Sequence, residues 1–165
     1  LDVSRVTRGL IALVQEDVAA RLLVDEAVEQ ARPLVEARAH ALAIVDHADG
    51  ACVHGDRKRL VQVIANLLAN AAKYTPPGGT VTVQVRALAD GVLLSVDDSG
   101  PGIAAADRER VLDRFYRAPG TEATGSGLGL AIVKAVADLH GAALSLTDSP
   151  ELGGLRVEVR FALAR

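Results

Sequence analysis

The sequence predicts an α/β fold, in which helices cover one face of a mixed, mainly antiparallel sheet and form a two-layer sandwich. Long segments repeat apolar residues at helical spacing, whereas shorter segments alternate apolar and polar residues or are continuously apolar. The turn-forming pairs Asp49-Gly50 and Asp90-Gly91 separate strand-like segments. Both kinds of segment occur along one chain of 165 residues, which is typical of a single layered domain.

The first half of the chain is predicted to contain two long helices. Apolar positions recur at helical spacing from about Val18 to Ala39, although Pro33 is expected to kink or interrupt this helix. Asp56 stands where an N-cap residue belongs, before a helix from Arg57 to about Tyr74. The sequence Pro76-Pro77-Gly78-Gly79 ends that helix. Short strands are expected at residues 10–15, 41–45 and 51–54.

The second half is predicted to add a hairpin, two helices and two closing strands. Strands Thr80–Leu88 and Val92–Val96 flank the Asp90-Gly91 turn, as in a β-hairpin. The remaining elements are expected to be helices at residues 105–111 and 128–139, the second ended by Gly141, and strands at residues 143–147 and 155–163.

Composition excludes several functional classes. The net charge of −3 comes from interspersed charges of both signs, which argues against a nucleic-acid surface. The single Cys52 excludes an internal disulfide and a cysteine-based zinc site, and it fits a reducing cytosol. No apolar run approaches the roughly 20 residues of a membrane span, so no direct membrane contact is expected. Met is absent, including at position 1, so we expect a piece of a longer protein or a processed product.

Polar residues line one face of the helix predicted for residues 57–74. Gln62, Asn66, Asn70 and Lys73 follow one another at steps of three and four residues. One interpretation is an ordinary solvated face. The other is that the asparagine amide oxygens bind Mg²⁺, which prefers oxygen ligands, while Lys73 contacts phosphate.

Two glycine-rich segments each allow a structural and a functional interpretation. The segment Asp98–Ile103 is either a plain turn or a purine site, where a carboxylate accepts a hydrogen bond from the exocyclic amine. The segment Gly125–Leu130 is either a flexible linker or a phosphate site at the N-terminus of the following helix. It is not a dinucleotide fingerprint, because a loop rather than a strand precedes it, and it lacks the Gly-Lys-Ser/Thr ending of a Walker loop.

The residues between the two glycine segments suit a loop that covers a ligand. Phe115 and Tyr116 are expected to pack under the loop, whereas Arg114 and Arg117 are either solvated or in contact with phosphate. The small residues at positions 118–124 suit a lid that orders over nucleotide.

In this order, the segments resemble the sequence boxes of sensor histidine kinases. Asn66–Thr75, Asp98–Ile103, Asp113–Arg117 and Gly125–Leu130 are similar to the N, first-glycine, F and second-glycine boxes. The resemblance covers roughly residues 56 to 163. It implies the Bergerat fold, with a catalytic ATP-binding domain at residues 10–165 after the end of a dimerisation and phosphoacceptor hairpin helix at residues 1–9.

The resemblance also implies a set of ATP and Mg²⁺ contacts. Asn66 and Asn70 would hold Mg²⁺ and the phosphates, with Asn66 and Lys73 as the catalytic residues. Asp98 would accept a hydrogen bond from the adenine amino group, and Tyr74 and Ile103 would flank the base. The other implied nucleotide contacts are Gly100, Gly102, Arg114, Tyr116, Ser126, Gly127, Leu128, Gly129 and Leu130.

Two departures from the family pattern bear on function. The family's last glycine box places Thr after its glycine, whereas Leu155 follows Gly154 here, so a water-mediated adenine contact is in doubt while the strand is expected to survive. None of the four histidines has the context of a phosphate acceptor. The chain is therefore expected to bind ATP without labelling itself.

The function implied is transfer of the γ-phosphate of ATP to a histidine in a dimerisation hairpin outside this chain, with a response regulator downstream. The isolated fragment is expected to be monomeric and cytoplasmic. The full-length protein is expected to be a homodimer, and the sequence leaves undecided whether a membrane anchor holds it. Gyrase-, MutL- and Hsp90-like ATPases share the fold but place Glu where Asn66 stands, and Asn is no general base near neutral pH, which favours transfer over hydrolysis. A serine-directed anti-sigma-factor kinase and a nucleotide-binding pseudokinase remain as alternatives.

Overall fold

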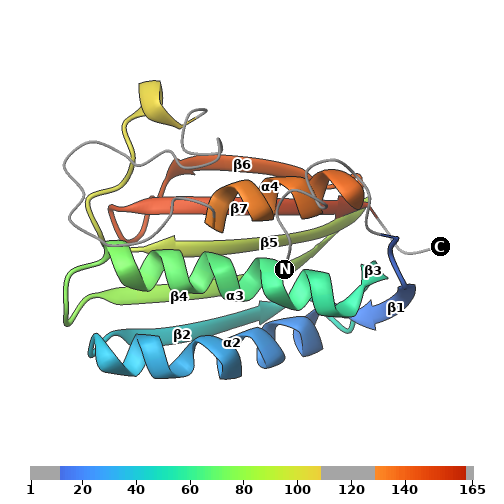
Figure 1. Cartoon of the computed structure of the whole chain (residues 1–165), viewed down its shortest axis with the longest axis horizontal. Coiled ribbons are helices and arrows are strands. Elements are labelled where there is room, and N and C mark those ends of the chain that lie inside the picture. The colour runs from blue at the N-terminus through green and yellow to red at the C-terminus, as the bar shows by residue number, and fades with distance from the viewer. Residues whose placement is uncertain (1–11, 109–128, 163–165) are drawn as a thin grey trace.

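The computed structural model describes residues 12–108 and 129–162, and three helices cover one face of its larger sheet (Figure 1). The elements, labelled as in Figure 1, are β1 Gln15–Ala19, α2 Ala20–Ala37, β2 Ala41–His47, β3 Cys52–Asp56, α3 Arg57–Tyr74, β4 Thr80–Leu88, β5 Gly91–Asp98, the 3₁₀ turn Ala105–Asp107, α4 Gly129–Leu139, β6 Ala143–Asp148 and β7 Leu155–Ala162. The predicted two-layer α/β sandwich is confirmed.

The larger sheet has five strands in the order β2-β4-β5-β7-β6. Only β2 and β4 run parallel, and the other neighbours are antiparallel, so the predicted mixed, mainly antiparallel sheet is confirmed. The predicted hairpin is also confirmed, with β5 extended to Asp98. Strands β1 and β3 form a separate two-stranded antiparallel sheet, whereas the sequence interpretation had placed every strand in one sheet.

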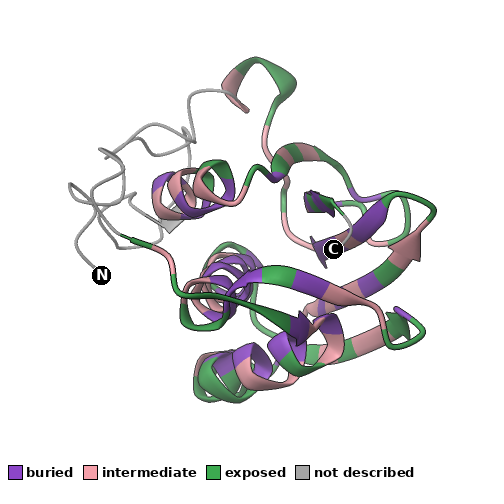
Figure 2. Cartoon of the chain, turned by 90° about the vertical axis from the view of Figure 1, so that its right-hand side faces the viewer, coloured by how far each residue is buried: buried purple, intermediate pink, exposed green. Residues whose placement is uncertain are grey.

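Strand β4 shows how the sequence builds the core. Val81, Val83 and Val85 are fully buried against the helices, while the alternating residues Thr82 and Gln84 are half-buried on the opposite face. Figure 2 shows the buried residues gathered between the helices and the sheet. With so few aromatic residues, the core consists of Val, Leu, Ile and Ala from all three helices and the central strands, joined by Phe161 of β7.

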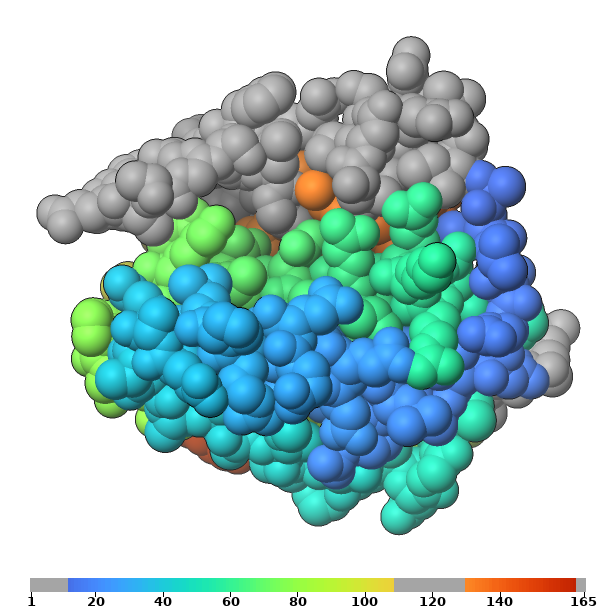
Figure 3. Space-filling model, turned by 60° about the horizontal axis from the view of Figure 1, so that its bottom comes forward, coloured from blue at the N-terminus to red at the C-terminus, as the bar shows by residue number. Residues whose placement is uncertain are grey.

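Helix α3 lies in the middle of the helical layer and begins and ends as predicted. The Asp56 side chain accepts a hydrogen bond from the Arg59 amide at 3.2 Å, as expected of an N-cap residue. Its buried stripe includes Leu60, Ile64 and Leu67. Helix α2 packs beside it, and the surfaces of the two helices adjoin in Figure 3. The position of α3 is therefore fixed by burial along its length.

The first strand was predicted at the wrong position, and the expected interruption of the helix at Pro33 does not occur. The first strand lies at Gln15–Ala19 rather than at residues 10–15, because pairing with β3 sets its bounds and leaves Val14 outside and 81% exposed. Helix α2 continues through Pro33 to Ala37. Pro33 removes only the hydrogen bond to the Glu29 carbonyl, and both residues are on the exposed side of the helix, where water can replace that bond.

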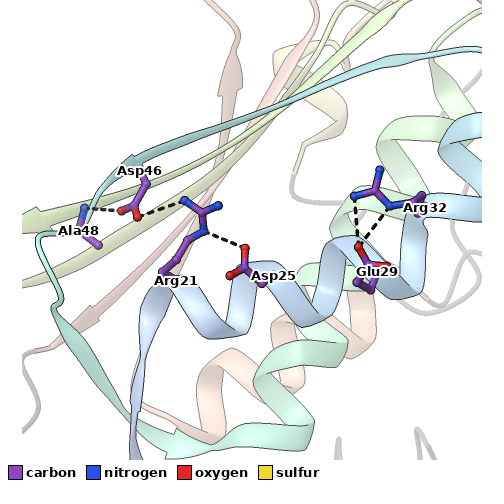
Figure 4. A network of polar contacts seen from close by, with 6 residues as sticks. All are labelled: Arg21, Asp25, Glu29, Arg32, Asp46 and Ala48. Atoms are coloured by element: carbon purple, nitrogen blue, oxygen red, sulfur yellow. Dashed lines mark hydrogen bonds and ion pairs between the residues drawn. The ribbon is translucent and has the colours of Figure 1, made fainter.

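Arg21 links the outer surface of α2 to β2 through an ion pair (Figure 4). Arg21 contacts Asp25 one turn along the helix at 2.8 Å and Asp46 of β2 at 3.2 Å. The Ala48 amide donates to Asp46, and together with Arg21 it lowers the pKa of that carboxyl group. Within residues 12–108 and 129–162, no helix combines the length and hydropathy required to cross a membrane.

Candidate functional site

The polar face predicted on α3 is present beside the buried stripe. Asn66 and Asn70 are half-buried, Gln62 is half-buried one turn earlier, and Lys73 is exposed near the end of the helix. Among the described residues, neither asparagine side chain has a hydrogen-bond partner in the protein. Two half-buried amides without such partners are available to a ligand, and their oxygens are suited to a hard cation or its water shell.

Asp98 ends β5 next to the C-terminal turn of α3 and is buried, with 7% of its surface exposed. Its Oδ1 atom accepts hydrogen bonds from the amides of Gly100 at 2.9 Å and Leu155 at 3.2 Å. Burial raises the pKa of this carboxyl group. No described residue donates to Oδ2, so one oxygen is fixed by the backbone and the other is free to accept from a ligand.

Glycines allow the backbone to close around Asp98. A Cβ atom on Gly100 would lie 2.8 Å from the Tyr74 carbonyl oxygen and 3.2 Å from Asp98 Oδ1, so this turn lies directly against the end of α3. A Cβ on Gly154 would collide with the carbonyl and carboxylate oxygens of Asp98. Gly102 adopts a φ of 74°, which other residues rarely adopt. Two glycine segments distant in sequence thus meet at one carboxylate.

A buried network that the sequence interpretation missed holds the β6–β7 turn in place. Asp97 accepts a hydrogen bond from Ser149 Oγ at 2.7 Å and from Arg156 Nε at 2.9 Å. The Ser149 amide in turn donates to the Gly154 carbonyl at 2.8 Å. The only sequence signal was the doubled Asp97-Asp98, because Ser149 and Arg156 lie more than 50 residues away.

Ile103 and Tyr74 lie at the edge of the site. Ile103 packs partly against the core, and Tyr74 is exposed at the last position of α3. Arg108 donates to the Ile103 carbonyl at 3.1 Å and pairs with Asp148 of β6 at 2.5 Å, which ties this loop to the sheet. The loop that carries Ile103 is therefore anchored at both ends, by Gly100 and by Arg108.

Several predicted site residues lie outside the described part of the chain: Arg114, Tyr116, Ser126, Gly127 and Leu128. The described part of α4 begins at Gly129, and Leu130 packs partly against the core. Of the helix predicted at residues 105–111, the described portion forms only the 3₁₀ turn Ala105–Asp107. No cluster of three or more His, Cys, Asp or Glu able to hold a metal occurs in residues 12–108 and 129–162.

A polar helix, a buried carboxylate and glycine turns adjoin in this structure, and comparison with known proteins gives the class of the domain. The family described as histidine kinase-, DNA gyrase B-, and HSP90-like ATPase matches residues 55–165, and the chain belongs to this family. Within it, the chain is a catalytic ATP-binding domain of the sensor histidine kinase type.

The relatives and solved structures agree on this class. The chain is 43% identical over 112 residues to the swarming motility regulation sensor protein RssA of Serratia marcescens, covering 67% of this chain and 24% of RssA. It is similar to the solved mycobacterial sensor histidine kinase MprB, with 32% identity, a TM-score of 0.78, and coverage of 91% of this chain and 98% of that one.

A further solved structure holds a nucleotide analogue. This is full-length ShkA in complex with AMPPNP, with 28% identity, a TM-score of 0.82, and coverage of 98% of this chain and 34% of ShkA. The chain spans only about a quarter of the length of the curated relatives that it matches.

Proposed function

We propose that this domain binds Mg²⁺ and ATP and transfers the γ-phosphate to a histidine in a dimerisation hairpin of the full-length protein. The observation that carries the proposal is the geometry of Asp98. A buried carboxylate with one oxygen held by two amides and the other free is suited to accept from an exocyclic amine. The AMPPNP complex of the similar protein ShkA supports a nucleotide as the ligand.

The adenine end of the proposed site uses Asp98 and the residues packed around it. Asp98 Oδ2 accepts from the adenine amine, and Tyr74 and Ile103 lie on either side of the base. Gly100 and Gly102 leave room for the base to approach the backbone. This assignment explains why the sequence places a costly buried carboxylate at the end of β5.

The phosphate end of the proposed site lies along α3 and the start of α4. Lys73 contacts phosphate, and the N-terminus of α4 at Gly129 and Leu130 provides amides and a dipole for the same anion. Asn66 and Asn70 fit Mg²⁺ through their unpartnered amides, and the ion when bound neutralises phosphate charge. The remaining proposed contacts are Arg114, Tyr116, Ser126, Gly127 and Leu128.

The chemistry proposed is transfer rather than hydrolysis. Asn66 has no acid–base chemistry near neutral pH, so it positions groups instead of activating water. The relatives named as sensor proteins or sensor histidine kinases favour a histidine acceptor. We extend the proposal to a homodimeric full-length protein, to a response regulator that takes the phosphate from the histidine, and to a cytoplasmic location of this domain.

Binding is tested by calorimetry with AMPPNP and Mg²⁺ on the whole chain and on Asn66→Ala and Asp98→Ala. The wild-type chain is expected to bind, and both variants are expected to lose detectable binding while keeping their circular dichroism spectra. Unchanged binding in both variants would refute the site assignment.

Transfer is tested with γ-labelled ATP and the separate hairpin of the full-length protein. Acid-labile label on the hairpin histidine supports the proposal, whereas the isolated chain is expected to remain unlabelled. Label on serine would indicate a serine kinase, release of free phosphate an ATPase, and binding without transfer a pseudokinase.

A further inference from the structure

The last carbonyl groups of a helix have no amide partner within the helix, and the residues that follow α3 cannot provide one for two of them. In a continuing helix, the carbonyls of Ala72 and Lys73 would accept from the amides four residues later. Those positions are Pro76 and Pro77, which have no N–H group. The proline pair that ends the helix therefore leaves two acceptors beside the proposed nucleotide site that need another partner.

Arg38 provides that partner from the end of α2. Its Nε atom donates to the Ala72 carbonyl at 3.0 Å, and its Nη2 atom lies 2.7 Å from the Thr75 carbonyl and 3.3 Å from that of Lys73. One planar guanidinium thus contacts three carbonyl groups of the turn, which a lysine ammonium cannot match in geometry. Its positive charge is also favourable at the C-terminus of a helix.

His40 completes the contact between the two elements. It is buried, and its Nε2 atom donates to the carbonyls of Thr75 and Pro76, each at 3.0 Å. Ala39, between the two residues, adopts a φ of 55°, and the Gly78 amide donates to the Arg38 carbonyl at 3.0 Å. The α2–β2 junction therefore holds the end of α3 and the turn that follows it.

The same turn carries residues of the proposed site. Lys73 and Tyr74 lie within it, and the Tyr74 carbonyl is in contact distance of Gly100, next to Asp98. A shift of the turn would move the phosphate-contacting residue and the base-flanking residue relative to the carboxylate. Displacements of this kind, on the order of 1 Å, are costly to ligand positioning.

We propose that Arg38 is a positioning residue for nucleotide binding, acting through the C-terminal turn of α3. The inference rests on the proposed function. Arg38 lies outside residues 55–165, the range that matches the family model, and outside the sequence motifs from which the site was predicted. It touches no proposed ligand atom. It fixes the distance between the residues at the end of α3 and Asp98.

The test compares Arg38→Ala and Arg38→Lys with the matched control Arg32→Ala on the whole chain. Arg32 is on the same helix, is exposed, and contacts only Glu29 among the described residues. Affinity for AMPPNP with Mg²⁺ is measured at a temperature at which melting curves show each variant fully folded. We expect affinity to fall about tenfold in Arg38→Ala and by a smaller factor in Arg38→Lys. Lys keeps the positive charge but lacks the planar guanidinium that contacts several carbonyl groups at once. Arg32→Ala should match the wild type.

The outcomes separate the inference from the proposed function. If the wild type binds AMPPNP and folded Arg38→Ala binds it with equal affinity, the inference is overturned and the proposed function is unaffected. Absence of wild-type binding overturns the function itself. If Arg38→Ala does not fold, Arg38→Lys decides: weaker binding at a near wild-type melting temperature supports the inference, and unchanged binding overturns it.

Discussion

The backbone amide of Leu155 donates a hydrogen bond to Asp98 Oδ1 at 3.2 Å, joining the first residue of β7 to the last residue of β5. The sensor kinase pattern places Thr at position 155. The backbone contact does not depend on the side chain, so the strand survives the change to Leu, as the sequence predicted. Leu155 instead packs in the hydrophobic core. The amide at position 155 therefore still helps to orient the carboxylate.

The substitution Leu155→Thr is expected to change AMPPNP affinity by less than about threefold, because the amide at this position is retained. It should lower the free energy of unfolding by about 1–2 kcal/mol, since a buried apolar side chain is shortened and a hydroxyl is introduced. Calorimetry and urea unfolding measure the two effects. A gain in AMPPNP affinity of more than tenfold would contradict this expectation and would mean that the Leu155 side chain weakens nucleotide binding.

Asp98→Asn is expected to remove AMPPNP binding while leaving the chain at least as stable as wild type at pH 7. The Asn carbonyl oxygen can still accept from Gly100 and Leu155, but its NH₂ group would face a donor on the base. Burial raises the pKa of Asp98, so the folded state takes up its proton at a higher pH than the unfolded state does.

The pH dependence of Asp98→Asn follows from this shift. The wild type should lose stability as pH rises from the unfolded pKa through the raised folded pKa, and the variant should lack this loss. Melting temperatures of both proteins across the acid range check the sign. If the melting temperature of the variant instead exceeded that of the wild type by more as the pH falls, the raised pKa assigned to Asp98 would be contradicted.

Asp97→Asn is expected to act in the opposite direction on stability, although the residue is adjacent. The Asp97 carboxylate is paired with Arg156 and Ser149, and removing its charge leaves a partly buried guanidinium without its counter-ion. We expect a loss of about 1–3 kcal/mol in the free energy of unfolding. Urea unfolding of the two variants at pH 7 makes the comparison, and equal effects would refute it.

Gly154→Ala is expected to destabilise the chain by about 2–4 kcal/mol, because the new methyl group would collide with backbone and carboxylate oxygens of Asp98. The neighbouring Gly153→Ala is the control. Gly153 has a φ of 82° and nothing within 4 Å of an added Cβ, so only conformational strain of about 1–2 kcal/mol is expected there. Similar losses in both variants would show that crowding at Asp98 is not the cause.

His140→Ala is expected to lower the free energy of unfolding by about 1–2 kcal/mol without changing nucleotide affinity. The Asp56 amide donates to His140 Nε2 at 3.0 Å, so the ring hydrogen is on Nδ1, which donates to the Val136 carbonyl at 2.8 Å. Losing the ring leaves the Asp56 amide without its partner. His54→Ala, which removes an exposed ring paired with Asp17, should cost less. A larger loss in His54→Ala would contradict this order.

Local signals made α3 predictable to the residue. The Asp56 side chain accepts a hydrogen bond from the first turn of the helix, and Pro76 and Pro77 prevent the helix from continuing for another turn. Both ends of α3 are therefore predicted by residues next to them in the sequence. The strand predicted at residues 10–15 failed for the complementary reason. Only Val18 of strand β1 is buried, so the strand has no alternation of apolar and polar residues from which it could be predicted. Its position follows from backbone pairing with β3.

Candidate site residues could be proposed from sequence where a function requires particular residue types, but not where distant residues act together. Asn66, Asn70 and Asp98 could be singled out as candidates because their spacing and glycine neighbours form motifs. Arg38 could not, since its partners lie more than 30 residues away and are backbone carbonyls, which carry no sequence signal. Its role depends on two prolines that look like simple helix terminators.

The parallel pairing of β2 with β4 has a practical consequence for dividing this chain. The match to the family model begins at residue 55, yet β2 covers the outer side of β4, and α2 contributes Leu23, Val24 and Val28 to the shared core. A chain trimmed to the matched residues would bare a nine-residue edge strand rich in valine, together with the apolar flank of α3. Such an edge recruits other strands, so the trimmed domain is expected to self-associate and precipitate.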